Sequence, residues 1–150
     1  MESVRSLLRK VIFSQYYAVL SSSKDGRSYS NLVAFAASDD LKTVVFATGK
    51  GTEKFKRISN NGNVSLLIDN RTNRPADVSK AVAITASGRA GEAPTDRSKE
   101  LLLKRHPGLY RFINSPATAV ISIEICEYVL AHFDHTERLS PESIQNKDYL

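Results

Sequence analysis

The residues with the clearest potential for chemistry lie in one short segment of this chain, residues 47–54. The segment combines small, hydroxyl and basic residues, in the order Ala47, Thr48, Gly49, Lys50, Gly51, Thr52, Glu53 and Lys54. The two glycines would let the backbone come close to a ligand, and the two threonines offer hydroxyl groups. Lys54, with Lys50 as a second candidate, supplies positive charge. This combination predicts a site for an anion, with a phosphate group as the candidate.

The elements predicted around this segment would place it at the start of a helix. Residues 43–47 form a β-branched and aromatic run, which predicts a buried strand. Residues 52–60 carry two apolar side chains three positions apart among basic ones, which predicts a short helix, and Asn60-Asn61-Gly62 predicts its left-handed stop. The N-terminus of such a helix attracts a phosphate through its free N–H groups and its dipole. The alternative is an ordinary capped turn before a solvated basic helix, since neither the Walker pattern nor the dinucleotide-binding glycine pattern is present.

A strand with one face of small side chains is predicted upstream, at residues 28–37. Ser28, Ser30, Ala34 and Ala36 fall on one face of this strand, and larger side chains such as Tyr29, Val33 and Phe35 fall on the other. A face of small residues leaves room for a flat ring to lie against the backbone. The alternative is that a helix or a second sheet packs closely there.

Several stretches of this chain, in this order, resemble the FMN-binding split-barrel superfamily of pyridoxamine 5'-phosphate oxidase-like proteins. They are Lys24-Asp25-Gly26-Arg27, then Tyr29-Ser30-Asn31-Leu32-Val33, then Phe46-Ala47-Thr48 with Thr52 and Lys54, and finally residues 60–67. The ordered set carries the resemblance, which runs from about Tyr16 to His132. It implies a mainly β fold with flanking helices, a six-stranded antiparallel split β-barrel, a homodimer, and FMN bound in the dimer groove.

The resemblance also implies which residues hold the cofactor. The phosphate would lie on Thr48, Thr52 and Lys54, beside Ala47 and Gly51, and the ring would lie along Ser30, Asn31, Leu32 and Val33. Asn70 and Arg71 begin a loop, residues 71–77, that in this superfamily can lie near the flavin of the partner subunit. Because the chain has no tryptophan and is shorter than the vitamin-forming oxidases, we do not expect it to oxidise pyridoxamine phosphate. A deazaflavin would use much of the same groove, and the His106-Pro107 region is similar to the superfamily's haem-utilisation branch.

The rest of the chain predicts one domain, residues 1–150, built largely from hairpins. An amphipathic helix is expected over the first dozen residues, and further strands at 16–22, 64–69, 81–90 and 118–133. The Asp-Gly turn at residues 24–27 predicts a tight hairpin, and Gly88 predicts a bulge. Thr95 is expected to cap a helix that ends near Arg105. The polar tail from Glu137 is expected to be ordered only if it docks.

Composition narrows the class of partner. The chain has a formal net charge of +5, which suits an anionic partner, but the basic residues are scattered, so we do not expect nucleic acid. Its one cysteine, Cys126, lies in a strand-like run and is expected to be a buried, inert thiol. Because the first residues are charged and no apolar run is long enough for a membrane span, we expect no secretory signal, no membrane insertion and a cytoplasmic protein.

No other catalytic constellation stands out. His132, Asp134 and His135 could suggest a metal, but without a third convergent ligand a surface cluster is the better interpretation, and no metal is expected. The favoured hypothesis is an FMN-dependent oxidoreductase or flavin reductase that acts on a small molecule, with NAD(P)H as a candidate electron donor and no catalytic side chain assigned. A flavin-binding sensor without turnover is an alternative. A haem-handling protein, with His106, His132 or His135 as ligand, is another.

Overall fold

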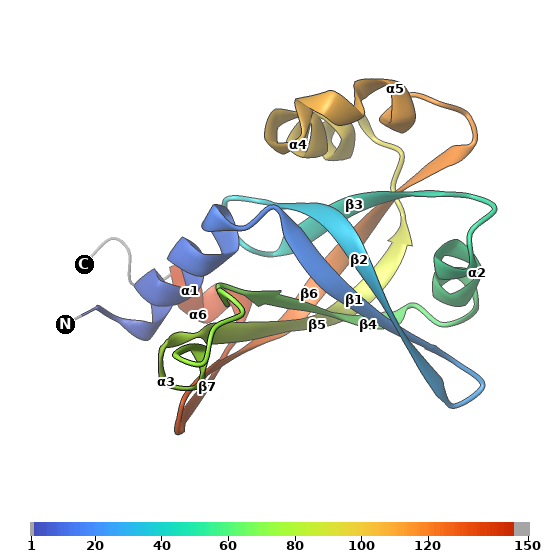
Figure 1. The fold of residues 1–150 in the computed structure, drawn as a ribbon. Helices are drawn as coiled ribbons and strands as arrows, with labels where there is room; N and C mark the ends of the chain where they lie inside the picture. The colour runs from blue at the N-terminus through green and yellow to red at the C-terminus, as the bar shows by residue number, and fades with distance from the viewer. Residues whose placement is uncertain (1, 146–150) are drawn as a thin grey trace.

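The computed structural model describes residues 2–145, and seven strands form its centre. They are β1 (Tyr17–Lys24), β2 (Arg27–Ala37), β3 (Thr43–Gly49), β4 (Asn63–Asp69), β5 (Val82–Glu92), β6 (Thr118–His132) and β7 (His135–Leu139). The strands pair antiparallel in the order β3-β2-β1-β4-β5-β6-β7, and a further β3–β6 pairing closes the first six into a barrel (Figure 1). The predicted six-stranded antiparallel barrel is therefore confirmed, and β7 is an extra strand beside β6.

Helices cover the two ends of the barrel and one of its sides. They are α1 (Val4–Ser14), α2 (Glu53–Asn60), α3 (Asp77–Lys80), α4 (Asp96–Arg105), the 3-10 turn η1 (Pro107–Leu109), α5 (Tyr110–Ile113) and α6 (Pro141–Gln145). Figure 1 shows α1 and α2 at opposite ends of the barrel, with α4 and α5 outside it, over β3. Among the described residues, no helix is both long enough and apolar enough to cross a membrane.

The barrel interior is filled by alternate side chains of every strand of the barrel. On β2 the odd-numbered side chains Val33 and Phe35 point inward, as predicted, and the small even-numbered Ser28 and Ser30 lie exposed outside. On β6, Ala119, Ile121, Ile123 and Ile125 are inward and buried, which also agrees with the prediction. Burial of this apolar surface is the main driving force that closes the barrel.

The alternation in β6 reverses at a bulge, and this overturns the expectation for Cys126. Gly88 of β5 pairs with Ile125 and Ser87 pairs with Glu127, so Cys126 is the extra residue of the bulge. Its side chain is exposed instead of buried. The predicted bulge at Gly88 is confirmed, and a Cβ atom there would lie 2.1 Å from Glu124 O, which explains the glycine.

One further expectation needs correction. Asn61, which ends α2, is extended (φ −141°), so the predicted left-handed stop is wrong. Gly62 serves close packing instead, since a Cβ atom there would lie 2.9 Å from Ala90 O.

The tail from Glu137 agrees with its expectation, because its described part is ordered where it docks. It contributes to β7 and then forms α6, whose Ile144 is fully buried in the core. Residues 146–150 of that tail lie outside the described residues.

The close approach at Gly88 gives a stability prediction. Gly88→Ala should destabilise the fold by about 1–3 kcal/mol, the usual cost of overpacking a rigid site, because the new methyl group meets backbone that cannot move freely. Gly91→Ala, in the same strand, is the matched control, since a Cβ atom there meets nothing within 4 Å. Urea unfolding curves of the two variants would measure the difference, and coincident midpoints would contradict the assignment.

Candidate functional site: the opening between β2 and β3

The barrel is split where β2 and β3 separate. Only three residue pairs join these strands, Phe35–Phe46, Ala36–Val45 and Ala37–Val44. Before Phe35, β2 pairs with β1 alone, and after Phe46, β3 pairs with β6 alone. The first part of β2 therefore has one edge with no strand partner, and we call this separation of β2 from β3 the opening. Figure 1 shows β3 continuing past this point toward α2.

The edge of β2 that faces this opening presents backbone hydrogen-bonding groups. The tight hairpin, with Asp25 and Gly26 at φ 53° and 75°, closes on the pair Lys24–Arg27. In such a ladder alternate residues bond to the partner strand, so odd-numbered residues of β2 bond to β1. The 3.2 Å bond from Phe35 N to Tyr16 O follows this pattern. The even-numbered residues that direct their N–H and C=O groups to the opening are Ser28, Ser30 and Leu32.

On the other side, Thr52 caps α2 and organises the turn before it. Its Oγ1 accepts a hydrogen bond from Phe55 N at 3.3 Å and donates to Gly49 O at 2.8 Å. Thr48 Oγ1 lies 3.0 Å from Thr52 Oγ1, and the Thr48 side chain is buried. Both hydroxyls thus build the turn, and their predicted contact with a phosphate stays a prediction.

The groups of this turn that could bind an anion are backbone N–H groups and the side chain of Lys54. Glu53 and Lys54 are the first residues of α2, so their N–H groups have no partner within the helix. The Lys54 side chain is half-buried on the same turn, and Gly51 is exposed beside it. Lys56 differs, because its ammonium group pairs with Glu53 at 3.5 Å. The local sequence therefore folds into the helix start that was predicted.

Two features beside the opening add to the site. Asn31 Oδ1, at a predicted cofactor position, is buried and has no hydrogen-bond partner among the described residues. A buried acceptor without a partner is uncommon, so a ligand with an N–H group could satisfy it. The Arg57 guanidinium lies 3.2 Å from the centre of the Tyr29 ring and fastens α2 to the β1–β2 hairpin.

Not every predicted site residue is free to touch a ligand. Val33 points into the barrel core, and Ala47 packs against the apolar cluster beneath α4 and α5. Their backbone can border the opening, but their side chains serve packing. Ser30 and Leu32, by contrast, are exposed on the outer face of β2.

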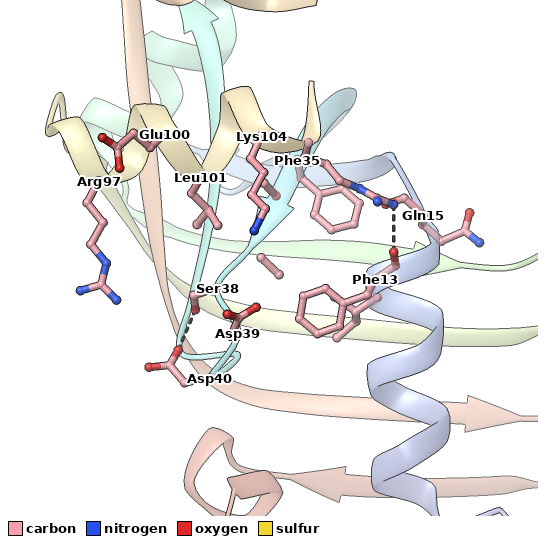
Figure 2. A pocket seen from close by; sticks show the side chains of 14 residues that line it. Phe13, Gln15, Phe35, Ser38, Asp39, Asp40, Arg97, Glu100, Leu101 and Lys104 are labelled. Carbon is pink, nitrogen blue, oxygen red and sulfur yellow. Dashed lines mark hydrogen bonds between the residues drawn. The ribbon is translucent and has the colours of Figure 1, made fainter. Parts of the chain in front are cut away.

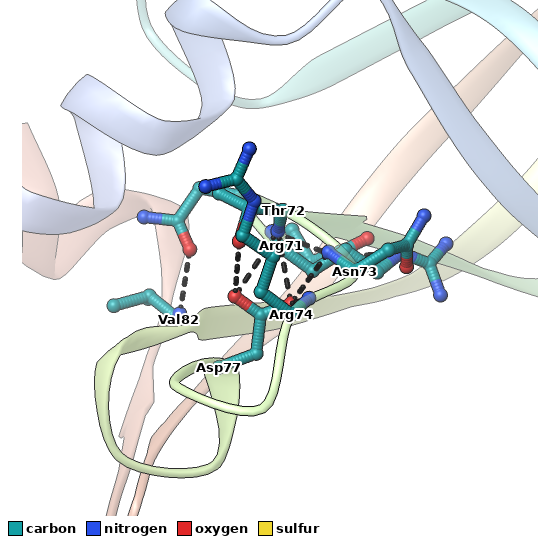
Figure 3. Close-up of polar contacts among 8 residues, drawn as sticks. Arg71, Thr72, Asn73, Arg74, Asp77 and Val82 are labelled. Carbon is teal, nitrogen blue, oxygen red and sulfur yellow. Dashed lines mark hydrogen bonds and ion pairs between the residues drawn. The ribbon is translucent and has the colours of Figure 1, made fainter.

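Asn70 and Arg71 lie away from α2, in a loop with its own polar network (Figure 3). Asn70 Oδ1 accepts a hydrogen bond from Val82 N at 2.7 Å, and Arg71 Nε pairs with Asp69 at 3.0 Å. The Asp77 carboxylate accepts from Thr72 N at 2.9 Å and also from the N–H groups of the next two residues. Those hydrogen bonds, from Thr72 first, hold the pKa of Asp77 below its usual value. The loop is exposed, and hydrogen bonds to the Asp77 carboxylate hold its backbone in place.

Arg71 shares a shallow depression of about 190 Å³ with Leu32, Val19 and Leu67 on the outer face of the sheet. Figure 1 shows that this loop and α2 lie at opposite ends of the barrel. Within one chain, therefore, Asn70 and Arg71 do not join the residues around the α2 N-terminus. Their predicted contact with the flavin of a partner subunit stays a prediction.

The histidines are not arranged as a metal site. His106 is the C-cap residue of α4, where its backbone N–H donates to Leu102 O. Its side-chain Nε2 lies 2.9 Å from Phe35 O and ties the end of α4 to β2. His135 pairs with Glu137 at 3.1 Å in the β6–β7 hairpin. Within residues 2–145 no three His, Cys, Asp or Glu side chains gather into a group that could hold a metal ion.

A family comparison agrees with this geometry. The family model described as pyridoxamine 5'-phosphate oxidase matches residues 4–128. The chain belongs to this family. A search of curated proteins found no match.

Solved structures that resemble this member of the pyridoxamine 5'-phosphate oxidase family share its fold at low identity. A heme binding protein from Mycobacterium smegmatis has a TM-score of 0.84 at 12% identity; the match covers 96% of this chain but only 60% of that one. General Stress Protein 26 from Bacillus anthracis str. Sterne has a TM-score of 0.67 at 21% identity, over 91% and 98% of the two chains. A related protein from Clostridium acetobutylicum, of the pyridoxinephosphate oxidase family, has a TM-score of 0.74 at 15% identity, over 93% and 96%.

Sequence reasoning missed some parts of this family member's site. The open backbone edge of β2 depends on where pairing with β3 stops, which no side-chain pattern reveals. The role of Asp77 could have been found, because an aspartate a few residues after Thr72 and Asn73 is typical of a turn that binds its own N–H groups.

The Asp77 network gives a prediction about the loop. Asp77→Asn should speed hydrogen exchange at the amides of Thr72, Asn73 and Arg74, because a neutral amide is a weaker acceptor. Asp134→Asn, the same change in the β6–β7 turn, is the control and should leave those amides unaffected. Folding lowers the pKa of Asp77, so the ionised carboxylate stabilises the loop at pH values above the usual pKa of aspartate. This stabilisation is lost as the pH falls through the lowered pKa. Equal exchange in both variants would contradict this role.

Proposed function

We propose that the chain binds FMN in the opening between β2 and the start of α2, in a groove completed by a second copy, and acts as an oxidoreductase or flavin reductase on a small molecule. The observation that carries the proposal is the early end of β2–β3 pairing. It leaves an unpaired strand edge beside a helix N-terminus, which suits a flat polar ring that carries a phosphate.

The phosphate end of FMN fits the α2 turn. The free N–H groups of Glu53 and Lys54 would donate to phosphate oxygens, and the helix dipole adds to the attraction. The Lys54 ammonium would supply the full positive charge, while the exposed Gly51 lets the phosphate approach. The hydroxyls of Thr48 and Thr52 hold this turn in shape.

The ring of FMN fits the edge of β2. The N–H groups of Ser30 and Leu32 would orient it and hold negative charge on it, and Asn31 Oδ1 offers an acceptor. FMN when bound supplies the electron-transfer chemistry, and the protein supplies orientation and access. Among the described residues, the groups with a shifted pKa are Asp40, Asp77 and Tyr128, which lie in a turn, a loop and the core, and not in the opening. The proposal accordingly assigns no catalytic acid or base.

The second copy would pack on the outer face of the sheet. The register aligns two rows across the strands: an apolar row of Leu32, Val19, Leu67, Thr85 and Val129, and a row of Ser30, Ser21, Ser65 and Ser87. Leu32 is 67% exposed in the single chain, and its neighbours in the apolar row are half-buried. A broad face of apolar and small hydroxyl side chains lets two sheets approach closely. Packing there would also cover the depression beside Arg71 with the partner's groove residues.

Other readings of the same groove are separable by experiment. A sensor would bind FMN without turnover, so rapid reduction of bound flavin by NADPH or NADH in stopped flow, followed by reoxidation by an acceptor, supports the enzyme.

Haem is a second candidate because a structural neighbour is a heme binding protein. For His106 to ligate iron its Nε2 would have to leave Phe35 O, and a Soret band on haem titration would favour that function.

The phosphate assignment gives a binding prediction. The protein should take up FMN, with flavin absorbance at about 450 nm, and Lys54→Gln should weaken affinity about five- to tenfold, because one charge-assisted hydrogen bond is lost. Lys56→Gln is the matched control on the same helix, since Lys56 pairs with Glu53. Equal affinities for the two variants would remove the phosphate from this turn, and no uptake of FMN would end the proposal.

The groove's second half gives a separate prediction. Leu32→Asp should convert a dimer to a monomer in analytical ultracentrifugation and weaken FMN retention, because a charge would be buried between the sheets. Tyr110→Asp places the same charge on α5, where Tyr110 is 64% exposed, and should change neither property. A wild-type protein that is monomeric with FMN bound would contradict the shared groove.

A further inference from the structure

A second cavity lies beyond the end of the opening, between α1, α4 and the β2–β3 turn. Its volume is about 570 Å³, which is within the range of small-molecule sites. The strand β2 enters it at Phe35, after the last residue that borders the opening. Figure 2 shows side chains from α4 on one side and from α1 and the turn on the other. The FMN proposal does not use this cavity.

The walls of the cavity are aromatic and aliphatic. Phe13 of α1 presents its ring, and Leu101 of α4 points in from the opposite side (Figure 2). Phe35 of β2 also borders the cavity, but it is buried in the core and little of its ring is open to a ligand. Arg9 stiffens this wall, because its guanidinium stacks 5.2 Å from the Phe13 ring and donates to Asp39 O at 3.0 Å. Such walls favour a flat apolar group.

Two opposite charges face the mouth of the cavity without partners of their own. Figure 2 shows the Lys104 side chain extending from α4 toward the turn that carries Asp39. Neither side chain forms an ion pair with another described residue. Arg97 and Glu100 of α4 also line the cavity, at the end of the helix farther from α1 (Figure 2). Asp40 accepts from Ser38 Oγ at 2.7 Å, and Arg105 donates to Phe13 O at 2.9 Å.

We propose that this cavity binds a small zwitterion with an aromatic side chain, of the class of an aromatic amino acid. The ring packs between Phe13 and Leu101, the ammonium group faces Asp39, and the carboxylate faces Lys104. A ligand with one charge of either sign would satisfy one of these two side chains and meet the other as a like charge. A zwitterion satisfies both, and the apolar walls select its side chain.

The test uses three probes and two variants of the full chain. L-phenylalanine carries both charges, phenethylamine lacks the carboxylate, and 3-phenylpropionate lacks the ammonium group. Backbone amide NMR titrations locate binding, and the expected shifts lie at residues 36–40 and 100–105. Each missing charge should weaken binding about two- to fivefold, the range of an exposed ion pair.

The variants assign each charge to its partner. Lys104→Gln should weaken the binding of L-phenylalanine and of 3-phenylpropionate, but not of phenethylamine. Asp39→Asn should weaken the binding of L-phenylalanine and of phenethylamine, but not of 3-phenylpropionate. Lys99→Gln, on the same helix and outside the cavity, should change none of them. Shifts absent from these residues, or equal affinity for all three probes in all variants, would overturn the proposal. Since the readout does not involve flavin, its failure is distinguishable from failure of the FMN proposal.

Discussion

The constraint on which the structure depends is the length of the pairing between β2 and β3. Three residue pairs join them, and three also join β1 and β4, whereas the other neighbouring strands of the barrel are paired over much longer stretches. Extending that pairing would satisfy the edge of β2 within the chain and leave no backbone groups for a ligand. The barrel tolerates the split because the long β6 pairs with both β3 and β5 and closes the wall from the other side.

The elements around the split keep it in a fixed shape. α2 begins at its Thr52 cap, and Arg57 in its last turn lies over the Tyr29 ring and ties the helix to the β1–β2 hairpin. At the other end of β2, the turn to β3 is held by Tyr128, whose buried hydroxyl donates to Leu41 O at 2.7 Å, while Leu41 itself adopts a left-handed conformation (φ 59°). Burial raises the pKa of that hydroxyl, so it remains a donor. Rigid surroundings of this kind preorganise a binding site.

Much of this arrangement follows from local sequence. The period-two pattern gave the two faces of β2 and the inward face of β6, the Asp-Gly hairpin gave its turn, and Thr95 gave the cap of α4. What failed depended on distant partners. Cys126 is exposed because a bulge opposite Gly88 shifts the face of β6, and Gly62 is small because Ala90 lies against it. The candidate site was predicted from side chains, yet its open strand edge is defined by where the pairing of β2 with β3 ends. The Thr48 hydroxyl is hydrogen-bonded within its own turn. The loop at Arg71 lies far from α2, and only a second copy could join the two.

Backbone hydrogen exchange on β2 tests the central claim most directly. With FMN added, the amides of Ser30 and Leu32 should exchange more slowly than in the free protein, while those of Tyr29 and Val33, already bonded to β1, should change little. Binding of FMN with no added protection at Ser30 and Leu32 would contradict the account, because the cofactor would then lie somewhere other than the open edge.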